Sequence, residues 1–502
     1  MSNLYSLIKY FRGGAAEDEK DIRGEVFVPP GNMDDLLSFD FHSNVILLGN
    51  KGVGKSIFVN VIHEAYLKNK ELSVLITPDD LECDPILERK TLSDKKAVAY
   101  AQMLKAIACI IGAHSNKCEV GISEDIVYLQ KLAISEGYAK ADLISKFSNI
   151  LSKVTPYCSE IAQSLLEQQN NIMGVNQLTD TVGKYLSKKD KILWLFLDDI
   201  DAAVAKDPRN GFDYGACWAI VSAAIELSQD IPNLRCLVSV RSDIWHVMTK
   251  IQRHGQERKD KLGFVHELKF SEDELRSIFN RRIELAANDA KSNKMIYTFF
   301  KDVKVLLPGE SFNRRTWDQW LSKISRNRPR DLVKAVQMLI NEAKRSNQDL
   351  IGDDCAHAIL LGFGKGRIEN IIDEYDKMCP QINEVVNDLT AKNTYTFNEL
   401  IEILEKTPAR RRTQLDGVPM QQTKEDAIKL LRILHMACFI NPRLEGDGDD
   451  AEYKHFNFHD YPELIDFTKL NDLQRYKWQV HPAFHTYSHD MRQKKKNLST
   501  LG

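Results

Sequence analysis

Residues 49–56 have the types and the spacing of a loop that binds phosphate groups. Their sequence, GNKGVGKS, fits the pattern G-x-x-x-x-G-K-[ST] at every fixed position and lies between an apolar run and a helical pattern. Glycines let the backbone adopt φ angles that other residues resist, so that successive N–H groups converge on one anion. Lys55 would reach the β- and γ-phosphates of a nucleotide, and the hydroxyl of Ser56 would bind Mg²⁺. We therefore expect a nucleotide-binding loop formed by Gly49, Asn50, Lys51, Gly52, Val53, Gly54, Lys55 and Ser56.

A pair of carboxylates follows a second apolar run. Residues 191–201 have the sequence KILWLFLDDID, in which a buried parallel strand would end at Asp198 and Asp199. From this position Asp198 would hold Mg²⁺ through water, and Asp199 would polarise the water that attacks the γ-phosphate. Asp201 is a further candidate for contact with the groups around the metal.

Arginines stand at two further positions that suit phosphate recognition. Residues 234–240 form another apolar run that ends at Arg241, and a cation at that strand end would face the γ-phosphate and report its presence. Three more arginines precede the helical pattern of residues 331–345, namely Arg326, Arg328 and Arg330. Two interpretations of this cluster remain open, a role in phosphate binding and a solvated charged face.

The elements that would position these residues are five strands and the helices between them. The strand patterns cover residues 45–48, 73–77, 234–240 and 264–268, in addition to the run before Asp198. Residues 81–190 show helical periodicity with hardly a strand signal, which indicates a helical insertion. The sequence therefore predicts an α/β fold with a parallel sheet.

The last third of the chain has a different pattern. Residues 396–405 and 424–437 have helical periodicity, and two short strand patterns follow at 453–458 and 476–480, which together predict a winged-helix-like region. Residues 362–366, GFGKG, are expected to form a loop. The expected domains are an N-terminal helical segment (1–24), a core (25–270) with its insertion (81–190), a helical lid (271–348) and the C-terminal winged-helix-like domain (349–502).

Composition limits the classes of function. The chain has 502 residues, a net charge of −3 and nine cysteines without a C-x-x-C pair, which is typical of a soluble protein in a reducing compartment. No apolar run approaches the roughly 18 residues that span a membrane, so we expect a cytoplasmic protein with no membrane partner. The basic residues 492–496 are too few to establish binding of nucleic acid, and a solvated terminus is the simpler interpretation.

In combination these motifs resemble those of the STAND and AAA+ groups of P-loop ATPases. GNKGVGKS is similar to a Walker A motif, and LFLDD at residues 195–199 is similar to a Walker B motif. LVSVRSD at residues 237–243 resembles a sensor-1 strand with the arginine common in STAND proteins, and NRPRD at residues 327–331 resembles a lid motif. The glycine loop also resembles that of a bacterial group of single-chain ATPases often found near phage-defence genes. The resemblance implies an ASCE/AAA+-like P-loop NTPase fold, ATP and Mg²⁺ as cofactors, and Arg330 as a sensor-2 residue.

The resemblance also implies an ATP-driven switch. It would control its own oligomerisation, as a homo-oligomer, or a separately encoded effector protein, in bacterial antiviral defence. Asp199 stands where AAA+ proteins usually have a glutamate, which implies slow hydrolysis. The catalytic set would be Lys55, Asp198, Asp199 and Arg241. An arginine finger has three candidates and no motif to choose among them: Arg209, Arg281 and Arg282.

Two other classes of function stay open. A DNA-acting ATPase, such as an initiator-like or transposition-type loader, would use the C-terminal winged helix and have nucleic acid as its partner. A non-hydrolysing scaffold would bind the nucleotide without turnover. ATP is expected rather than GTP because the sequence contains no N-K-x-D-type guanine-binding motif.

Overall fold

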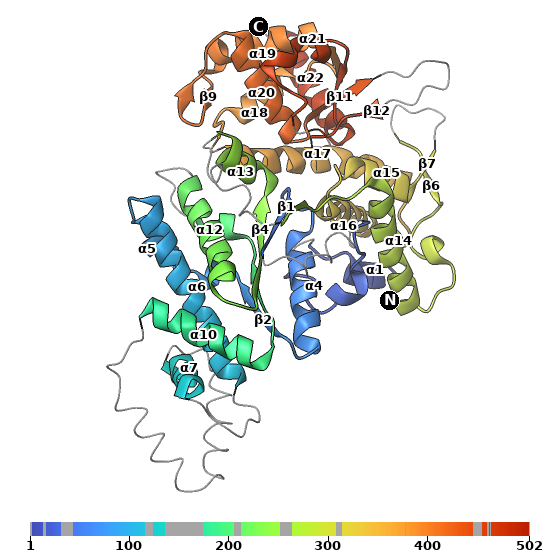
Figure 1. Ribbon diagram of the computed structural model, residues 1–502. Coiled ribbons are helices and arrows are strands. Elements are labelled where there is room, and N and C mark those ends of the chain that lie inside the picture. The colour runs from blue at the N-terminus through green and yellow to red at the C-terminus, as the bar shows by residue number, and fades with distance from the viewer. Residues whose placement is uncertain are drawn as a thin grey trace. The chain divides into compact units, whose positions relative to one another are not determined.

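The computed structural model describes residues 3–13, 17–31, 44–115, 124–135, 174–204, 212–251, 264–307, 314–376, 378–444, 454–458, 461 and 463–500 (Figure 1). The chain divides into two compact units. The sheet unit comprises Asn32–Asn50 and Lys55–Leu268, and the helical unit comprises Met1–Gly31, Lys51–Gly54 and Lys269–Gly502. Residues 136–173 of the expected helical insertion lie outside the described residues.

The sheet unit is built on five parallel strands in the order β2-β3-β4-β1-β5. The strands are β1 (Asn44–Gly49), β2 (Leu72–Ile76), β3 (Leu193–Leu197), β4 (Leu234–Arg241) and β5 (Phe264–Glu267). The nearly continuous apolar sequences of β1 to β4 suit strands that are covered on both faces, and all five residues of β3 are buried, whereas none of the residues of the edge strand β5 is buried. Because β4 pairs with both β1 and β3, the three strands that carry the predicted site end at the same edge of the sheet. The predicted parallel α/β sheet is confirmed.

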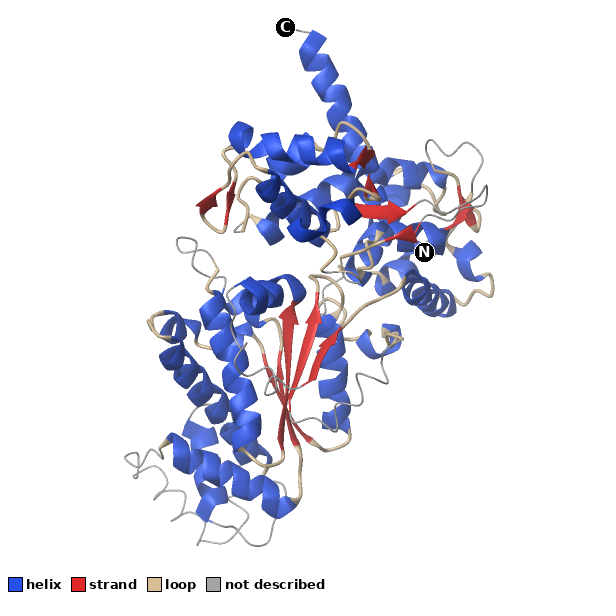
Figure 2. Cartoon of the chain, turned by 45° about the horizontal axis from the view of Figure 1, so that its top comes forward, coloured by secondary structure: helices blue, strands red, loops and turns tan. Residues whose placement is uncertain are grey.

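Helices cover both faces of this sheet (Figure 2). On one face α4 (Lys55–Lys68) buries Phe58, Val59 and Ile62. On the other face α6 (Leu92–His114), α10 (Val175–Lys189) and α12 (Tyr214–Asp230) share one apolar core with side chains of β2, β3 and β4. The remaining helices described in this unit are short or peripheral: a 3-10 turn (Pro78–Asp80), α5 (Cys83–Leu87), α7 (Glu124–Ser135), α11 (Ile200–Val204), α13 (Ser242–His246) and a π-helical turn (Val247–Ile251).

One described helix, α6, has the length and the apolar composition of a membrane span. Its most apolar window of 18 residues has a mean hydropathy of 1.4, although the sequence showed no uninterrupted apolar run of that length. Half of that window is buried inside the protein, where Met103, Leu104 and Ile107 contribute to the core that α6 shares with α12. Packing within the sheet unit therefore accounts for the apolar composition of α6.

The helical unit begins with α1 and continues after the sheet. α14 (Glu272–Asp289) starts at a capping box, in which the hydroxyl of Ser271 accepts from the Glu274 N–H (3.2 Å) and the Glu274 carboxylate accepts from the Ser271 N–H (2.6 Å). α1 (Leu4–Tyr10) packs against α14, and buried Arg282 of α14 forms an ion pair with buried Glu19 (2.6 Å). The other elements before residue 350 are α2 (Arg23–Val26), a 3-10 turn (Met295–Thr298), β6 (Lys304–Val305), β7 (Arg315–Thr316), α15 (Trp317–Ile324) and α16 (Pro329–Arg345).

The C-terminal part of the helical unit combines helices with a small antiparallel sheet in the order β12-β11-β13-β8. Two of these strands had no strand pattern in the sequence, because β8 (Thr394–Thr396) is short and β11 (Ile440–Leu444) contains Pro442. The remaining elements are α17 (Asp353–Tyr375), α18 (Ile382–Asp388), α19 (Phe397–Arg411), β9 (Gln414–Leu415), β10 (Val418–Pro419), α20 (Lys424–Met436), β12 (Lys454–His455), α21 (Leu470–Leu473), β13 (Lys477–Val480), α22 (His485–Thr500) and two 3-10 turns (Phe467–Lys469 and Pro482–Phe484).

The loop predicted at residues 362–366 is wrong, because these residues lie inside α17. Glycine in a helix costs roughly 0.5–1 kcal/mol relative to alanine, which is why the pattern GFGKG indicated a loop. Gly364 is explained by packing. A Cβ at Gly364 would lie 3.0 Å from the carbonyl oxygen of Ala483 and 3.2 Å from the Cβ of Tyr487, so the missing side chain lets α17 approach the start of α22 closely.

We expect Gly366→Ala to raise the free energy of unfolding by roughly 0.5–1 kcal/mol. Apart from its chain neighbours and the adjacent backbone of α17, no atom of the described residues lies within 4 Å of the position that the new Cβ would occupy, so only the gain in helix propensity remains. Gly364→Ala, two residues away in the same helix, should give a smaller gain or a loss, because its methyl group meets the Ala483 carbonyl. Urea unfolding of both variants measures the difference, and equal stabilisation by the two would contradict the packing role of Gly364.

Candidate nucleotide-binding site

The loop between β1 and α4 has the backbone geometry that phosphate binding requires. Gly52 and Gly54 have φ angles of 82° and 102°, which favour glycine. α4 begins at Lys55, so the N-terminus of a 14-residue helix opens directly from the loop. The Nζ of Lys55 donates to the carbonyl oxygen of Gly49 (2.6 Å) and to that of Asn50 (3.4 Å). The other predicted loop residues differ in exposure: Asn50 and Val53 are buried, and Lys51 and Ser56 are partly exposed.

The two predicted ligands of Mg²⁺ lie together. Asp198, at the end of β3, is buried, and its carboxylate is hydrogen-bonded by the hydroxyls of Ser239 (2.5 Å) and Ser56. Burial raises the pKa of Asp198, whereas these two hydrogen bonds and the charge of Lys55 act in the opposite direction. A serine hydroxyl and a carboxylate fit Mg²⁺, because this ion is usually bound by one or two protein groups together with substrate phosphates and water.

Ser239 connects the two adjacent acids. Its hydroxyl donates to Asp198 and accepts from the backbone N–H of Asp199 (3.2 Å), and its side chain is completely buried. Asp199 has a φ of 54°, in the left-handed region that few residues other than glycine adopt, and its side chain is exposed. The sequence did not identify Ser239 because its role depends on the pairing of β4 with β3.

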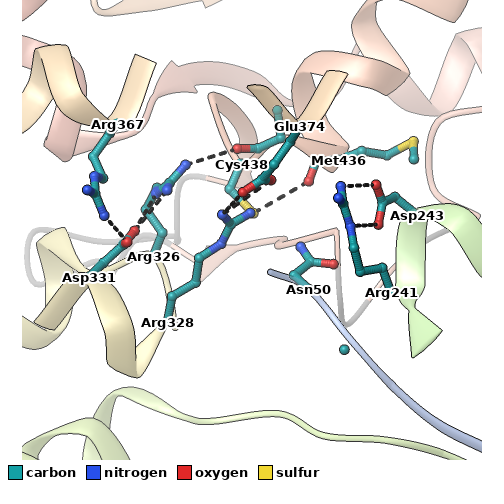
Figure 3. A network of polar contacts seen from close by, with 12 residues as sticks. Asn50, Arg241, Asp243, Arg326, Arg328, Asp331, Arg367, Glu374, Met436 and Cys438 are labelled. Carbon is teal, nitrogen blue, oxygen red and sulfur yellow. Dashed lines mark hydrogen bonds and ion pairs between the residues drawn. The ribbon is translucent and has the colours of Figure 1, made fainter. Parts of the chain in front are cut away.

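Arg241 reaches the site from β4. It is the last residue of this strand and lies opposite Gly49 of β1, the first residue of the loop. Its Nε and Nη2 donate to the two oxygens of Asp243 (3.1 and 2.6 Å; Figure 3). Its Nη1 lies 3.8 Å from Oδ2 of Asp201. Asp243 belonged to the motif LVSVRSD but was not given a role from the sequence, because nothing in its spacing indicated this pairing.

The two acids beside Arg241 have opposite pKa shifts. Burial raises the pKa of Asp201 to about 6, and one of its oxygens has no hydrogen-bond partner among the described residues. Burial also acts to raise the pKa of Asp243, but its charge interaction and hydrogen bonds with Arg241 outweigh it and hold that pKa below its usual value. Asp243 is therefore the firmly ionised partner of Arg241.

Arg330 lies at the tip of the loop, within the helical unit. Its backbone N–H donates to the carbonyl oxygen of Gly52 (3.2 Å), and a Cβ at Gly52 would lie 3.2 Å from the Cβ of Arg330. The backbone contact joins the first turn of α16 to the glycine loop. A role of the Arg330 side chain in sensing phosphate stays a prediction.

Arg326 and Arg328, which both precede Arg330, have an environment that differs from both sequence interpretations. Arg326 donates from Nε and Nη2 to Asp331 (3.0 and 2.8 Å), and Arg328 pairs with Glu374 of α17 (3.1 Å). The Arg326 and Arg328 side chains are 0% and 2% exposed, so neither forms a solvated face. Figure 3 shows Asp331 between Arg326 and Arg367 of α17, which also donates to it. These residues form a buried charge cluster: Arg326, Arg328, Asp331, Arg367 and Glu374.

The three candidates for an arginine finger also differ in burial. Arg282 is buried in its pair with Glu19, which leaves it unsuited to reach a neighbouring molecule. Arg281 is exposed and pairs with Glu284 (3.1 Å), one turn along α14. Arg209 lies outside the described residues.

Strand order and loop together define the class of fold. β4 lies between β1, which carries the glycine loop, and β3, which carries the acidic pair, and the loop opens into α4. This is the fold of P-loop NTPases of the ASCE type, which include the AAA+ proteins. The predicted fold class is confirmed.

Comparison with solved structures gives several likenesses at low sequence identity. No family model and no curated protein matches the chain. The ORC2 protein of Aeropyrum pernix, solved as ADPNP-ADP complexes, is 11% identical with a TM-score of 0.39 over 93% of this chain and 92% of its own. CDC6p of Pyrobaculum aerophilum is 11% identical with a TM-score of 0.33 over 89% and 96%. The RuvB Holliday junction branch migration motor of Thermotoga maritima is 12% identical with a TM-score of 0.30 over 70% and 80%. Because these TM-scores are below 0.5, the fold assignment depends on the strand order and the motifs.

We expect Asp201→Asn to stabilise the protein increasingly as the pH rises. Because folding raises the pKa of Asp201 from 3.8 to about 6, the folded state binds the proton more tightly and loses stability between these pH values. The loss is complete above about pH 6 and amounts to about 3 kcal/mol, which the asparagine variant avoids. Urea unfolding at about pH 5 and pH 7 should show a larger advantage of the variant at the higher pH. A constant difference between variant and wild type would contradict the raised pKa.

Proposed function

We propose that this protein binds ATP and Mg²⁺ at the glycine loop and hydrolyses ATP slowly, as a nucleotide-dependent switch. One observation carries the proposal: the sheet unit brings Lys55, Ser56, Asp198 and Arg241 to the same end of three adjacent strands. Two cations and a hydroxyl–carboxylate pair at a helix N-terminus are the groups that bind a nucleoside triphosphate with its metal. ATP is proposed over GTP on the sequence evidence given above.

Each residue has a part that its position supports. The loop N–H groups and Lys55 would bind the β- and γ-phosphates, and Ser56 and Asp198 would hold Mg²⁺, which supplies charge neutralisation to the triphosphate. Arg241 would donate to the γ-phosphate. The exposed carboxylate of Asp199 would orient the attacking water, with its backbone held in place by Ser239. Aspartate is shorter than the glutamate that most AAA+ proteins have here, which favours a slow reaction.

The contact between Gly52 and Arg330 supports the switch. A change in the loop backbone on nucleotide binding would act on the first turn of α16 through this hydrogen bond. We propose that the helical unit uses this coupling to control assembly of a homo-oligomer or a separately encoded effector. Bacterial antiviral defence is proposed as the setting on the resemblance of the glycine loop alone.

Action on DNA is the second candidate function, and the topology of the C-terminal part favours it. If β9, β10 and β12 are set aside, the order α18-β8-α19-α20-β11-β13, with β13 between β8 and β11, supports a winged helix in which α20 would face DNA. The charges on α20 do not favour strong binding of DNA, because Lys429 pairs with Glu425 (3.1 Å) and Asp426 (2.8 Å) on the same helix. Binding to labelled DNA at increasing salt would measure this function directly.

Light scattering coupled to size-exclusion chromatography tests the switch. The protein is run with ADP and with a non-hydrolysable ATP analogue, and ATP turnover is measured in parallel. We expect both nucleotides to bind, a larger assembly with the analogue only, and slow turnover. Binding without turnover or assembly would indicate the non-hydrolysing scaffold, and no binding of either nucleotide would overturn the proposed function.

A further inference from the structure

The pair formed by Arg241 and Asp243 is held in one orientation. Asp243 lies in the first turn of α13, and its side chain is 9% exposed. It accepts from Nε and Nη2 of Arg241 with both carboxylate oxygens, so that two parallel hydrogen bonds fix the plane of the guanidinium group. A single hydrogen bond would leave the group free to rotate.

The remaining nitrogen of the guanidinium group has a defined surrounding. Nη1 forms an ion pair with Oδ2 of Asp201 at 3.8 Å, and Lys55 is within electrostatic reach of both Arg241 and Asp243. Because Arg241 also pairs across the strands with Gly49, its backbone cannot shift relative to the loop without breaking the sheet. Backbone and guanidinium plane are thus both fixed beside the lysine that would bind phosphate.

We propose that Asp243 is a positioning residue, which holds Arg241 by Nε and Nη2 so that Nη1 is directed at the γ-phosphate of ATP. The proposal rests on the proposed function. Under this proposal the preference for ATP over ADP depends on Arg241 and Asp243 together, because ADP lacks the phosphate that Nη1 would contact. An arginine without this partner would have to be ordered by the nucleotide itself, at the expense of affinity.

A double-mutant cycle on the full chain tests the proposal. The measured quantity is the ratio of the dissociation constants for ADP and for a non-hydrolysable ATP analogue, both with Mg²⁺, in the wild type, Arg241→Ala, Asp243→Asn and the double variant. Asparagine keeps the size of Asp243 but can accept only one of the two hydrogen bonds. We expect each single variant to lower the ratio by roughly 10-fold and the double variant to lower it no further. Affinity for ADP should stay within about twofold of the wild type in all four proteins, which also shows that the site is folded.

Asp243→Glu adds a second line of evidence, because it keeps the carboxylate and should recover part of the preference for ATP. The proposal is overturned if Asp243→Asn leaves the ratio unchanged, if the two substitutions act additively, or if ADP and analogue lose affinity equally, which a purely structural role would give. Failure of the wild type to bind either nucleotide would overturn the proposed function along with it. If the wild type binds the nucleotide, Lys55→Ala abolishes this binding and Asp243→Asn leaves the ratio of the dissociation constants unchanged, only the role of Asp243 would be overturned.

Discussion

Lys55→Ala is expected to weaken the binding of ATP by roughly 100-fold and to abolish turnover. The Nζ of Lys55 lies against the carbonyl oxygens of Gly49 and Asn50, so the ammonium group is already held within the loop. Removing a hydrogen bond between charged groups costs roughly 1.5–3 kcal/mol, and Lys55 is the group placed to bond the β- and γ-phosphates. Isothermal titration calorimetry with ATP and Mg²⁺ measures the loss.

Lys68→Ala provides the matched control for this substitution. Lys68 is exposed at the other end of the same helix, and its replacement removes one positive charge from α4 without touching the loop. We expect wild-type affinity from this variant. Retention of ATP binding by Lys55→Ala would contradict the site. An unchanged melting temperature would show that a loss of binding does not come from unfolding.

Asp331→Ala is expected to cost about 3–5 kcal/mol in stability of the helical unit. The carboxylate is 2% exposed and is the shared partner of Arg326 (2.8 Å) and Arg367, so its removal leaves two buried guanidinium groups short of their acceptor. Burial acts to raise the pKa of Asp331, but the charges of Arg326 and Arg367 outweigh it and hold that pKa below its usual value, which keeps the group ionised at neutral pH. Differential scanning calorimetry should show a lower melting temperature.

Glu342→Ala is the control on the same helix. Glu342 pairs with Arg345, whose side chain is 76% exposed, and ion pairs that water can reach contribute little. We expect no measurable change in the melting temperature. A loss from Asp331→Ala as small as that from Glu342→Ala would show that the buried charge cluster relaxes easily, and that its ion pairs are not a fixed part of the helical unit.

The sheet and the loop could be predicted from the sequence because their signals are local. Strands β1 to β4 are largely apolar runs, and Lys55, Ser56 and Asp198 stand at fixed distances from such runs. Ser239 and Asp243 could not be assigned in the same way. Ser239 acts across the sheet on β3, and Asp243 acts backwards on Arg241, so both roles appear only when the strands are paired.

The errors in the helical unit have the opposite origin, because tertiary contacts there outweigh local pattern. Gly364 disfavours a helix by itself but permits the close approach of Ala483. Arg326 and Arg328 suggested phosphate or solvent because most arginines lie at the surface, whereas their partners Asp331 and Glu374 bury them. Glu374 lies 46 residues from Arg328 in the chain, a separation that no sequence pattern reveals.

The buried charge cluster also limits how this protein could have been assembled in evolution. Arg326 and Asp331 precede or begin α16, Arg367 and Glu374 lie on α17, and Arg326 donates as well to the carbonyl oxygen of Ala437 (3.3 Å), just after α20. A chain that ended at residue 348 would keep the three charged residues before α17. It would lose Arg367, a partner of Asp331, and Glu374, the partner of Arg328. The C-terminal part therefore could not be exchanged for another domain as an independent module, because any replacement would have to supply an acid for Arg328 and a base for Asp331 at the same places.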